Sequence, residues 1–408
     1  MKGVRNEVEK KLSREKKIRE DLEMVIGVPK EIMVNENRVA ATPETVQQYV
    51  SKGWTVIVER GAGEGSNFFD DEYKAKGAII EDDVERLYEQ ADLILKVKEP
   101  LFNEEKNKHE LDMMRKGQYL ITFLHPASPS NHEMVRKMAQ CGVISLTLDG
   151  IPRISRAQTM DALTSMSTCA GYKGIMMAAN SLSKFVPQIF TAVGAIQPAK
   201  ALVIGAGVAG LQAIATARRL GAVVYAADIR PEANEQAMSL GAKVIDLNIP
   251  SELAVGKGGY AKHLPEEWLV KEREQLAEMI RDMDIVFLSA LVPNRQAPIL
   301  VTEEMVKQMK PGSTIVDVSI DQGGNCEITP NGTSEVKHGV TIHGIKNIPG
   351  LIPETSTYMF AQNVFHLVNY LVKDDKIELD LDDEIVTSIL VTNDNEIVHN
   401  GAREAMGI

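Results

Sequence analysis

The feature that most constrains this chain is a glycine-rich turn that follows a short apolar run. Residues 201–204 lead into Gly205-Ala-Gly207-Val-Ala-Gly210, and a stretch with helical spacing, 211–220, comes next. A Gly-x-Gly-x-x-Gly turn between a strand and a helix is typical of a dinucleotide-binding Rossmann fold. The first glycine permits the tight turn, the second lets backbone approach a pyrophosphate, and the third lets helix and strand pack closely. The pattern therefore predicts phosphates at a helix N-terminus, where N–H groups and the helix dipole favour negative charge.

An acidic residue after the next apolar run indicates which dinucleotide binds. The run 223–227 ends in Asp228, close to the offset of about 20 residues at which an acid meets the adenosine ribose. A carboxylate there accepts hydrogen bonds from the ribose hydroxyls and repels a 2′-phosphate, which favours NAD(H) over NADP(H). Arg230 argues the other way, because an arginine can accommodate that phosphate. A glycine turn that binds nothing is the alternative, but the strand, helix and acid together favour a nucleotide site that also includes Val208 and Ile229.

Short apolar runs alternate with helical stretches along most of the chain, which is typical of βαβ units and a parallel sheet. The expected strands are 25–28, 55–59, 93–97, 120–124 and 143–148 in a first series, then 201–204, 223–227, 285–289 and 314–318 in a second. A long helical stretch from Asp161 towards Lys184 separates the series, and 358–372 predicts another amphipathic helix. We therefore predict an α/β chain of two Rossmann-like, doubly wound parallel-sheet domains joined by long helices.

These patterns also suggest where the domains begin and end. The expected parts are a helical N-terminal extension at 1–23, a first Rossmann-like domain at 24–160 plus 345–375, an NAD(H)-binding Rossmann domain at 161–344, and a C-terminal tail at 376–408. The tail is acidic and then β-like through 385–391. A mitochondrial transit peptide is the alternative for residues 1–23, but such peptides are poor in the acidic residues that this segment contains.

Composition excludes several classes of function. The formal net charge of -12 argues against general attraction to nucleic acid or anionic lipid, although a specific protein partner remains possible. No stretch approaches the roughly 20 consecutive apolar residues that cross a bilayer. The 3 cysteines include no Cys-x-x-Cys pair, so neither a disulfide framework nor a metal site is predicted. A reducing, cytoplasmic compartment is expected.

Beyond the glycine turn, several stretches resemble the NAD(H)-binding component of proton-translocating NAD(P) transhydrogenases, a family related to alanine dehydrogenase. The segment Pro152-Arg-Ile-Ser-Arg-Ala-Gln-Thr-Met-Asp161 resembles the family's nicotinamide loop. Arg153, Gln158 and Asp161 match its cofactor-contacting residues, and Thr164 stands where relatives usually carry serine. The chemistry is suitable, because Gln158 and Asp161 can hold a carboxamide or ribose and Arg153 can reach a phosphate or amide oxygen. Without the resemblance, such a polar loop would more often be simply solvated.

Further stretches resemble the same family. Gly258-Gly259-Tyr260-Ala261-Lys262 resembles its mobile loop, whose tyrosine folds over bound nucleotide, and the glycines supply hinges. A surface loop with an unrelated tyrosine is the alternative. Ser289-Ala-Leu291 resembles the stretch whose backbone meets the nucleotide. The tail matches the family as well, whereas plain alanine dehydrogenases end near the preceding helix.

Four residues point instead towards alanine dehydrogenase: Arg38, Lys98, His125 and Asp321 match positions that serve substrate and catalysis there. A guanidinium and an ammonium would hold the carboxylate and carbonyl of pyruvate, and a histidine would relay the proton. Many transhydrogenases lack the histidine and the Asp-Gln pair, so this chain departs from their commonest pattern. Taken singly, His125 at a strand end is more often structural, and Lys98 and Arg38 are often ordinary surface charges.

The resemblance implies an oxidoreductase that delivers a hydride from NADH directly to NADP⁺ held by a partner subunit. The partners would include a membrane-spanning proton path, and the chain, as a homodimer, would be cytoplasmic and peripheral to the inner membrane. Ring-to-ring transfer needs no general acid or base, so we assign positioning residues rather than a catalyst. NAD-dependent oxidative deamination of L-alanine to pyruvate is the second hypothesis. An NAD-binding regulatory module without a reaction of its own is the third.

Overall fold

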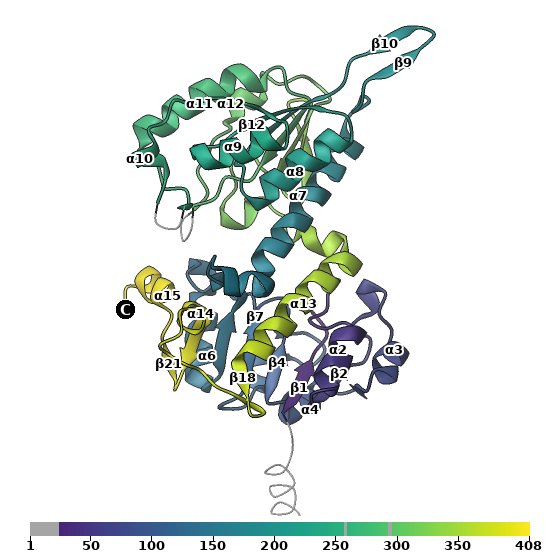
Figure 1. The fold of residues 1–408 in the computed structure, drawn as a ribbon, viewed down its shortest axis with the longest axis vertical. Helices are drawn as coiled ribbons and strands as arrows, with labels where there is room; N and C mark the ends of the chain where they lie inside the picture. Colours follow the sequence, from purple (N-terminus) through teal and green to yellow (C-terminus); the bar gives the residue numbers. More distant parts are fainter. Residues whose placement is uncertain (1–23, 257–258, 293–295) are drawn as a thin grey trace, which may run out of the picture. The chain divides into compact units, whose positions relative to one another are not determined.

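The computed structural model describes residues 24–256, 259–292 and 296–408, so the predicted helical extension at 1–23 lies outside the described residues. These residues form two compact units (Figure 1). One unit contains the described residues up to Leu163 together with Pro353–Ile408, and the other is Thr164–Ile352. Residues 345–352, expected in the first domain, thus group with the second unit, and the tail groups with the first. Among the described residues, no helix is long and apolar enough to cross a membrane.

The second unit is built on a seven-stranded sheet. Its strands lie in the spatial order β13 (Lys243–Val244), β12 (Val223–Ala227), β11 (Lys200–Ile204), β14 (Ile285–Leu288), β15 (Thr314–Asp317), β17 (Val340–His343) and β16 (Ser334–Lys337). All neighbours pair in parallel except β16, which is antiparallel to β17. The parallel strands therefore have the 3-2-1-4-5-6 order of a doubly wound dinucleotide fold, which confirms the predicted class.

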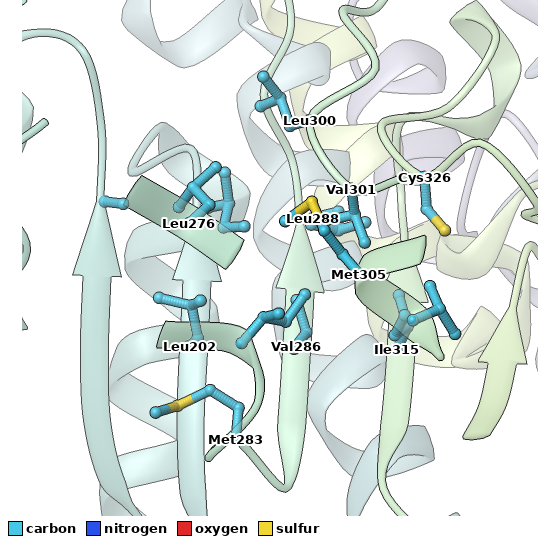
Figure 2. Close-up of a cluster of buried hydrophobic side chains, with 14 of the residues drawn as sticks. Leu202, Leu276, Met283, Val286, Leu288, Leu300, Val301, Met305, Ile315 and Cys326 are labelled. Carbon is cyan, nitrogen blue, oxygen red and sulfur yellow. The ribbon is translucent and has the colours of Figure 1, made fainter. Parts of the chain in front are cut away.

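Helices cover both faces of this sheet, because alternate residues of a strand point to opposite faces. Leu202 and Ile204 of β11 belong to one core, shown in Figure 2, whereas Ala201 and Val203 belong to the other. The helices of this unit are α7 (Ala162–Ser181), most of which lies in it, α8 (Val208–Arg219), α9 (Pro231–Ser239), α10 (Ser251–Ala254), α11 (Glu266–Ile280) and α12 (Glu303–Val306). The unit also carries the 3-10 turns η6 (Ile320–Gln322) and η7 (Ile348–Leu351) and a hairpin of β9 (Ile189–Thr191) and β10 (Gly194–Ile196). Figure 1 shows this hairpin projecting from the body of its unit.

The first unit repeats the same topology. Its eight-stranded sheet has the order β21 (Glu396–Ile397), β20 (Leu390–Asn393), β8 (Ile144–Thr147), β7 (Tyr119–Thr122), β4 (Leu93–Leu95), β1 (Val25–Val28), β2 (Thr55–Glu59) and β3 (Ile79–Glu81). The strands from β8 to β3 are parallel and again have the 3-2-1-4-5-6 order. Two-residue strands form the small hairpins β5 (Phe102–Asn103) with β6 (Lys108–His109), and β18 (Val372–Lys373) with β19 (Lys376–Ile377).

The helices of the first unit complete its layers. They are α2 (Pro43–Val50), α3 (Asp70–Ala75), α4 (Val84–Gln90), α5 (Glu110–Met113), α6 (His132–Cys141), α13 (Pro353–Leu371), α14 (Glu384–Ile389) and α15 (Asn400–Met406). Short 3-10 helices are η1 (Glu64–Ser66), η2 (Pro129–Asn131), η3 (Leu148–Gly150) and η4 (Ser155–Met160).

The tail corrects one prediction. The stretch 385–391 was expected to be β-like, but most of it is helix α14, and only Leu390–Asn393 forms a strand. The helix begins there because the Asp383 side chain accepts hydrogen bonds from the N–H groups of Ile385 and Val386, as an N-cap does. β20 then adds to the sheet antiparallel to β8, so the tail is part of the first unit's fold.

Candidate functional site

The glycine turn lies between β11 and α8, at the point where the strand order of the second sheet reverses. Gly205 has φ +88, which side chains rarely adopt, and a Cβ there would lie 2.7 Å from the backbone N of Ala290. A Cβ on Gly210 would lie 1.9 Å from the carbonyl oxygen of Gly205, so only glycine allows the helix this close to the turn. A Cβ on Gly207 would meet nothing within 4 Å. The backbone at Gly207 is thus open on the side from which a ligand would approach.

This opening fits a dinucleotide. Gly207 is the N-cap of α8, so the first N–H groups of a 12-residue helix begin beside the open space. A switch point at the carboxyl ends of parallel strands is where doubly wound sheets bind nucleotides, and a helix N-terminus favours a pyrophosphate. Val208, the predicted contact next to Gly207, is the first residue of α8.

Asp228 holds the glycine turn from the neighbouring strand. It follows β12 and is 7% exposed, and its carboxylate accepts a hydrogen bond from the N–H of Ala206 at 2.7 Å. Asn234 on α9 fixes the backbone of Asp228 on both sides, donating to its carbonyl at 2.8 Å and accepting from its N–H at 3.1 Å. The role of Ala206 was not predicted, although it is the variable residue inside the Gly-x-Gly motif. Ile229, also predicted here, is partly buried against the core of Figure 2.

Arg230 forms a chelating ion pair with Asp228. Its backbone N–H and Nε donate to Oδ1 of the carboxylate at 2.8 and 2.9 Å, and NH2 donates to Oδ2 at 2.8 Å. These hydrogen bonds raise the pKa of the Arg230 guanidinium, although burial by itself lowers it. The guanidinium that could otherwise receive a 2′-phosphate is therefore neutralised by the neighbouring acid.

Residues that follow β14 and β15 hold the glycine turn and the loop beside it. The Ser289 hydroxyl donates to the carbonyl of Gly205 at 2.7 Å, which ties β14 to the turn. Asn325 accepts from the N–H of Ala290 at 2.9 Å and donates to the Ala290 carbonyl at 2.8 Å, so it fixes the loop that leads to the exposed Leu291. Asn325 was missed by sequence reasoning. The signal available was its place directly after Gly323-Gly324, where two positive φ values form a sharp turn.

The Gly259-Tyr260 loop folds back on itself in the second unit. The N–H of Gly256 donates to the Tyr260 carbonyl at 2.7 Å, and Val255 and Ala261 form an antiparallel bridge. Arg230 NH1 donates to the Gly259 carbonyl at 3.4 Å, so this loop touches the Asp228 pair. Gly258, also part of the predicted motif, lies outside the described residues.

The predicted nicotinamide-positioning residues lie in a different unit from the glycine turn. Arg153, Gln158 and Asp161 belong to the first unit, around the 3-10 helix η4, whereas Thr164 groups with the second. Arg153 and Gln158 are exposed, and Asp161 is half-buried.

This segment is held firmly within its unit. Ala157 and Met160 are buried, and Asn363 on α13 donates to the Thr159 carbonyl at 2.8 Å. Arg156 pairs with Asp383, and its NH1 lies 2.9 Å from Oδ2 of that carboxylate. The tail thus helps to fix the loop that carries the predicted residues.

The four residues that match alanine dehydrogenase are divided between the two units, three in the first and one in the second. His125 follows β7 with φ +44, and its Nδ1 lies 2.7 Å from Oδ1 of Asp149. Arg38 is 2% exposed and pairs with Glu36, donating through Nε at 2.8 Å and NH2 at 2.6 Å. Asp321 lies in η6 of the second unit, whereas the other three residues of the set lie in the first.

Charge couples these residues inside the first unit. The negative charge of Asp149 raises the pKa of His125, against burial and the positive charge of Lys98, which both lower it. Burial acts to raise the pKa of Asp149, but the His125 ring and the Thr147 hydroxyl outweigh it and lower that pKa to about 2. Burial acts to raise the pKa of Glu36, but Arg38 and, to a smaller extent, the positive charge of Lys98 lower it. The Lys98 ammonium therefore lies near both the Arg38–Glu36 pair and the His125–Asp149 pair.

Comparison with known proteins agrees with this architecture. Residues 27–170 match a family model described as alanine dehydrogenase/PNT, N-terminal domain, and residues 174–400 match its C-terminal domain. The chain is 41% identical over 379 residues to the first part of NAD(P) transhydrogenase subunit alpha of Rhodospirillum rubrum, covering 92% of this chain and 98% of that protein. It is 36% identical over 344 residues to alanine dehydrogenase of Bacillus subtilis, covering 82% of each. A crystal structure of transhydrogenase from Sinorhizobium meliloti superposes with a TM-score of 0.80 at 39% identity, covering 92% of this chain and 100% of that one.

Proposed function

The chain belongs to the alanine dehydrogenase/PNT family, and we propose that it is the NAD(H)-binding subunit of a proton-translocating transhydrogenase. In this role it presents NADH so that a hydride passes directly to NADP⁺ held by a partner subunit. The higher identity to a transhydrogenase subunit than to alanine dehydrogenase supports this choice within the family. The observation that carries the nucleotide assignment is the open backbone at Gly207 beside the N-terminus of α8.

In this proposal the second unit binds the nucleotide. The α8 N-terminus takes the pyrophosphate, with Gly205, Gly207 and Gly210 allowing its approach. Asp228 holds the turn through Ala206 and keeps Arg230 neutralised, which supports a preference for NAD(H) over NADP(H). The predicted nucleotide contacts of this unit are Thr164, Val208, Ile229, Gly259, Tyr260, Ser289 and Leu291.

The first unit contributes the positioning of the ring. Arg153, Gln158 and Asp161 orient the nicotinamide, and the contacts of η4 with Asn363 and Asp383 keep their segment rigid. Hydride transfer between two rings needs orientation and exclusion of water rather than a proton carrier. The polar but uncharged side chain of Gln158 suits this task, because it can orient a ring without exchanging a proton with it.

Partner subunits complete the proposal. The chain would act with an NADP(H)-binding subunit and a membrane-spanning subunit, and it would reside in the cytoplasm, attached to the inner membrane only through them. The exposed hairpin supports a homodimer as well. Phe190 in β9 and Val193 in the turn of the hairpin are 75% and 93% exposed, which is unusual apolar surface on a projecting element, and Phe185 just before the hairpin is 56% exposed.

A reconstituted assay tests the main proposal. The purified chain is mixed with its NADP(H)-binding partner subunit, and reduction of a spectrally distinct NADP⁺ analogue by NADH is followed. We expect turnover with both chains present and none with either alone. NADH binding without turnover in the complete mixture would contradict the proposal and favour a regulatory module.

Alanine dehydrogenase remains a second candidate because of the His125–Asp149 pair, a geometry suited to proton relay. Against it, the Arg38 guanidinium is already paired with Glu36 in a buried position. NADH formation from L-alanine and NAD⁺ at alkaline pH decides between them. Robust turnover that His125→Ala abolishes would favour the amino-acid enzyme, whereas ring-to-ring transfer should tolerate the same change.

A further inference from the structure

Arg156 joins the predicted nicotinamide loop to the tail of the chain. It lies in η4, between Arg153 and Gln158, and its side chain is half-exposed. Its NH1 donates to the Tyr370 hydroxyl at 2.6 Å and to Oδ2 of Asp383 at 2.9 Å, and its NH2 donates to Oδ1 of Asp383 at 3.4 Å. The Tyr370 hydroxyl in turn donates to Oδ2 of Asp383 at 2.5 Å. The three side chains therefore form one closed hydrogen-bonded group.

Asp383 also begins helix α14. Its Oδ1 accepts hydrogen bonds from the N–H groups of Ile385 at 2.7 Å and Val386 at 3.4 Å. Burial acts to raise the pKa of Asp383, but Tyr370, Arg156 and the two backbone donors outweigh it and lower that pKa to about 2. The carboxylate is therefore charged at neutral pH. One charged group thus fixes both the start of α14 and the position of Arg156.

Helix α14 is itself anchored in the first unit. Three of its residues are buried there: Ile385, Val386 and Ile389. Strand β20 follows the helix directly and pairs with β8. The Thr392 hydroxyl of β20 donates to the Val143 carbonyl at 2.7 Å, which ties the strand to its neighbour. Because both the helix and the strand are fixed, α14 can act as a support for Arg156.

The same helix touches the nicotinamide loop at a second point. A Cβ on Gly150, in η3, would lie 2.1 Å from the carbonyl oxygen of Ser388, so only glycine allows α14 to come this close. Gly150 comes three residues before Arg153, and Arg156 comes three residues after it. The two contacts with α14 therefore lie on either side of Arg153 along the chain.

Helix α13 holds the next part of the loop. Asn363 donates to the Thr159 carbonyl at 2.8 Å, beside the predicted ring contact Gln158. Arg153 and Gln158 are exposed, and exposed polar segments are mobile unless their backbone is fixed by other contacts. The contacts from α13 and α14 supply this fixation, and those from α14 depend on a segment more than 200 residues further along the chain.

We propose that Asp383 and Tyr370 are positioning residues for hydride transfer, and that α14 acts through Arg156 to fix the loop that orients the nicotinamide. The inference rests on the proposed transhydrogenase function. Two reacting atoms must lie about 3–3.5 Å apart, and a displacement of about 1 Å costs roughly a hundredfold in rate. The ion pair of a half-exposed arginine contributes little to stability. Its effect is therefore expected in the rate of transfer rather than in the stability of the fold.

Three variants break the group in different ways. Asp383→Ser keeps a residue that caps helices, but its side chain is one atom shorter and does not reach Arg156. Arg156→Gln removes the guanidinium and leaves the cap of α14 in place. Tyr370→Phe removes only the hydroxyl. Asp382→Ser is the matched control, because Asp382 is the exposed acid next to Asp383.

The rate of a single hydride transfer from NADH to an NADP⁺ analogue is measured with the NADP(H)-binding partner subunit present, and NADH affinity is measured by fluorescence titration. Asp383→Ser and Arg156→Gln should transfer roughly ten- to a hundredfold more slowly. Their NADH affinity should stay within about twofold of the wild type, because the glycine turn lies in the second unit. Tyr370→Phe should lose less, since the ion pair remains, and Asp382→Ser should match the wild type.

A double variant shows whether the two charged residues act through one contact. Arg156→Gln combined with Asp383→Ser should be no slower than the slower single variant, because the second change removes a contact that the first has already broken. Losses that multiply in the double variant would mean that the two side chains act independently, which would overturn the proposal.

The remaining outcomes separate the inference from the function on which it rests. A wild-type mixture that transfers no hydride would contradict the proposed function itself. Wild-type transfer with undiminished rates in Asp383→Ser and Arg156→Gln would overturn the role of α14, and so would a loss of NADH affinity as large as the loss of rate. Arg156→Gln should keep the wild-type melting temperature, and it decides the matter if Asp383→Ser does not fold. A much lower melting temperature in Arg156→Gln would mark the group as structural and would also overturn the proposal.

Discussion

The Arg230 guanidinium donates hydrogen bonds to both carboxylate oxygens of Asp228, from Nε to Oδ1 at 2.9 Å and from NH2 to Oδ2 at 2.8 Å. The two residues that pointed to opposite nucleotide preferences in the sequence therefore form one neutral unit. Its carboxylate also accepts from the N–H of Ala206, so charge pairing and the shape of the glycine turn depend on the same group.

Asp228→Asn should separate these effects. We expect NADH affinity to fall by about 1–3 kcal/mol, because an amide oxygen replaces a charged acceptor at the turn. NADPH affinity should rise relative to NADH, since Arg230 loses its partner and becomes available to a 2′-phosphate. Titration with both nucleotides measures this, with Glu235→Gln on the exposed side of α9 as the control. An unchanged ratio of the affinities for NADH and NADPH would show that Asp228 does not select the nucleotide.

Two glycine variants should fail in different ways. Gly207 has φ -77 and ψ -167, which alanine adopts readily, and open space where the methyl group would stand. Gly207→Ala should therefore keep the wild-type melting temperature but lose at least about tenfold in NADH affinity, because the methyl blocks the pyrophosphate. Gly210→Ala should cost about 1–3 kcal/mol of stability as well, since its Cβ would overlap the Gly205 carbonyl. Wild-type NADH affinity in Gly207→Ala would place the phosphates elsewhere.

Tyr260 should lose mobility when nucleotide binds. The proton NMR signals of its ring, assigned by comparison with Tyr260→Phe, should broaden or shift when NADH is added. Tyr73, fully buried in the first unit, supplies signals that should stay constant. Tyr260 signals that remain sharp and unshifted at saturating NADH would mean that this loop is not a lid.

Because of the His125–Asp149 pair, the free energy of unfolding should decrease both at low pH and at high pH. The pKa of Asp149 is lowered to about 2, so its contribution is complete above the ordinary aspartate pKa and is lost as pH falls towards 2. The pKa of His125 is raised above 6.5, so its contribution is complete below 6.5 and is lost as pH rises through the raised value. The pair therefore stabilises most between about pH 4 and 6.5.

His125→Asn tests this window, because asparagine tolerates the left-handed backbone at φ +44 but does not titrate. The His125 side chain is 45% exposed, so solvent limits the contribution to no more than about 1 kcal/mol. Unfolding by denaturant at several pH values should give the variant a lower free energy of unfolding than the wild type at pH 5–6. At high pH the two free energies of unfolding should become similar. Parallel curves over the whole range would mean that the pair does not contribute to stability.

The exposed hairpin predicts an oligomer that one charge can disrupt. Phe190→Asp should convert a homodimer to a monomer in sedimentation experiments, because it places a charge on an apolar contact. Val336→Asp on β16, at a site that is 70% exposed outside the hairpin, should leave the dimer intact. A wild-type chain that sediments as a monomer, or a dimeric Phe190→Asp variant, would contradict the dimer.

The sequence by itself determined the elements whose causes are local. The glycine turn, its flanking strand and helix, and the acid after β12 could be predicted because each depends on backbone geometry or on a fixed offset along the chain. The βαβ alternation likewise predicted two parallel sheets, since parallel strands need helices that cover both faces, but the order of the strands came only from the structure. The tail was less predictable, because the apolar pattern of Ile385, Val386 and Ile389 suits a helix as well as a strand, and the Asp383 cap decided between them.

Only the tertiary structure decided how the polar groups of the site are shared. Whether Asp228 can still accept a ribose hydroxyl depends on Arg230 and on Ala206, which is far from it along the chain but adjacent in space. In the sequence, Glu272 is one of several charged residues in an amphipathic helix, and nothing local distinguishes it from Glu274. In the structure Glu272 is buried and Glu274 is exposed. Burial and the saturation of hydrogen-bonding capacity are sums over neighbours from many segments, so they arise only when the strands and helices have packed.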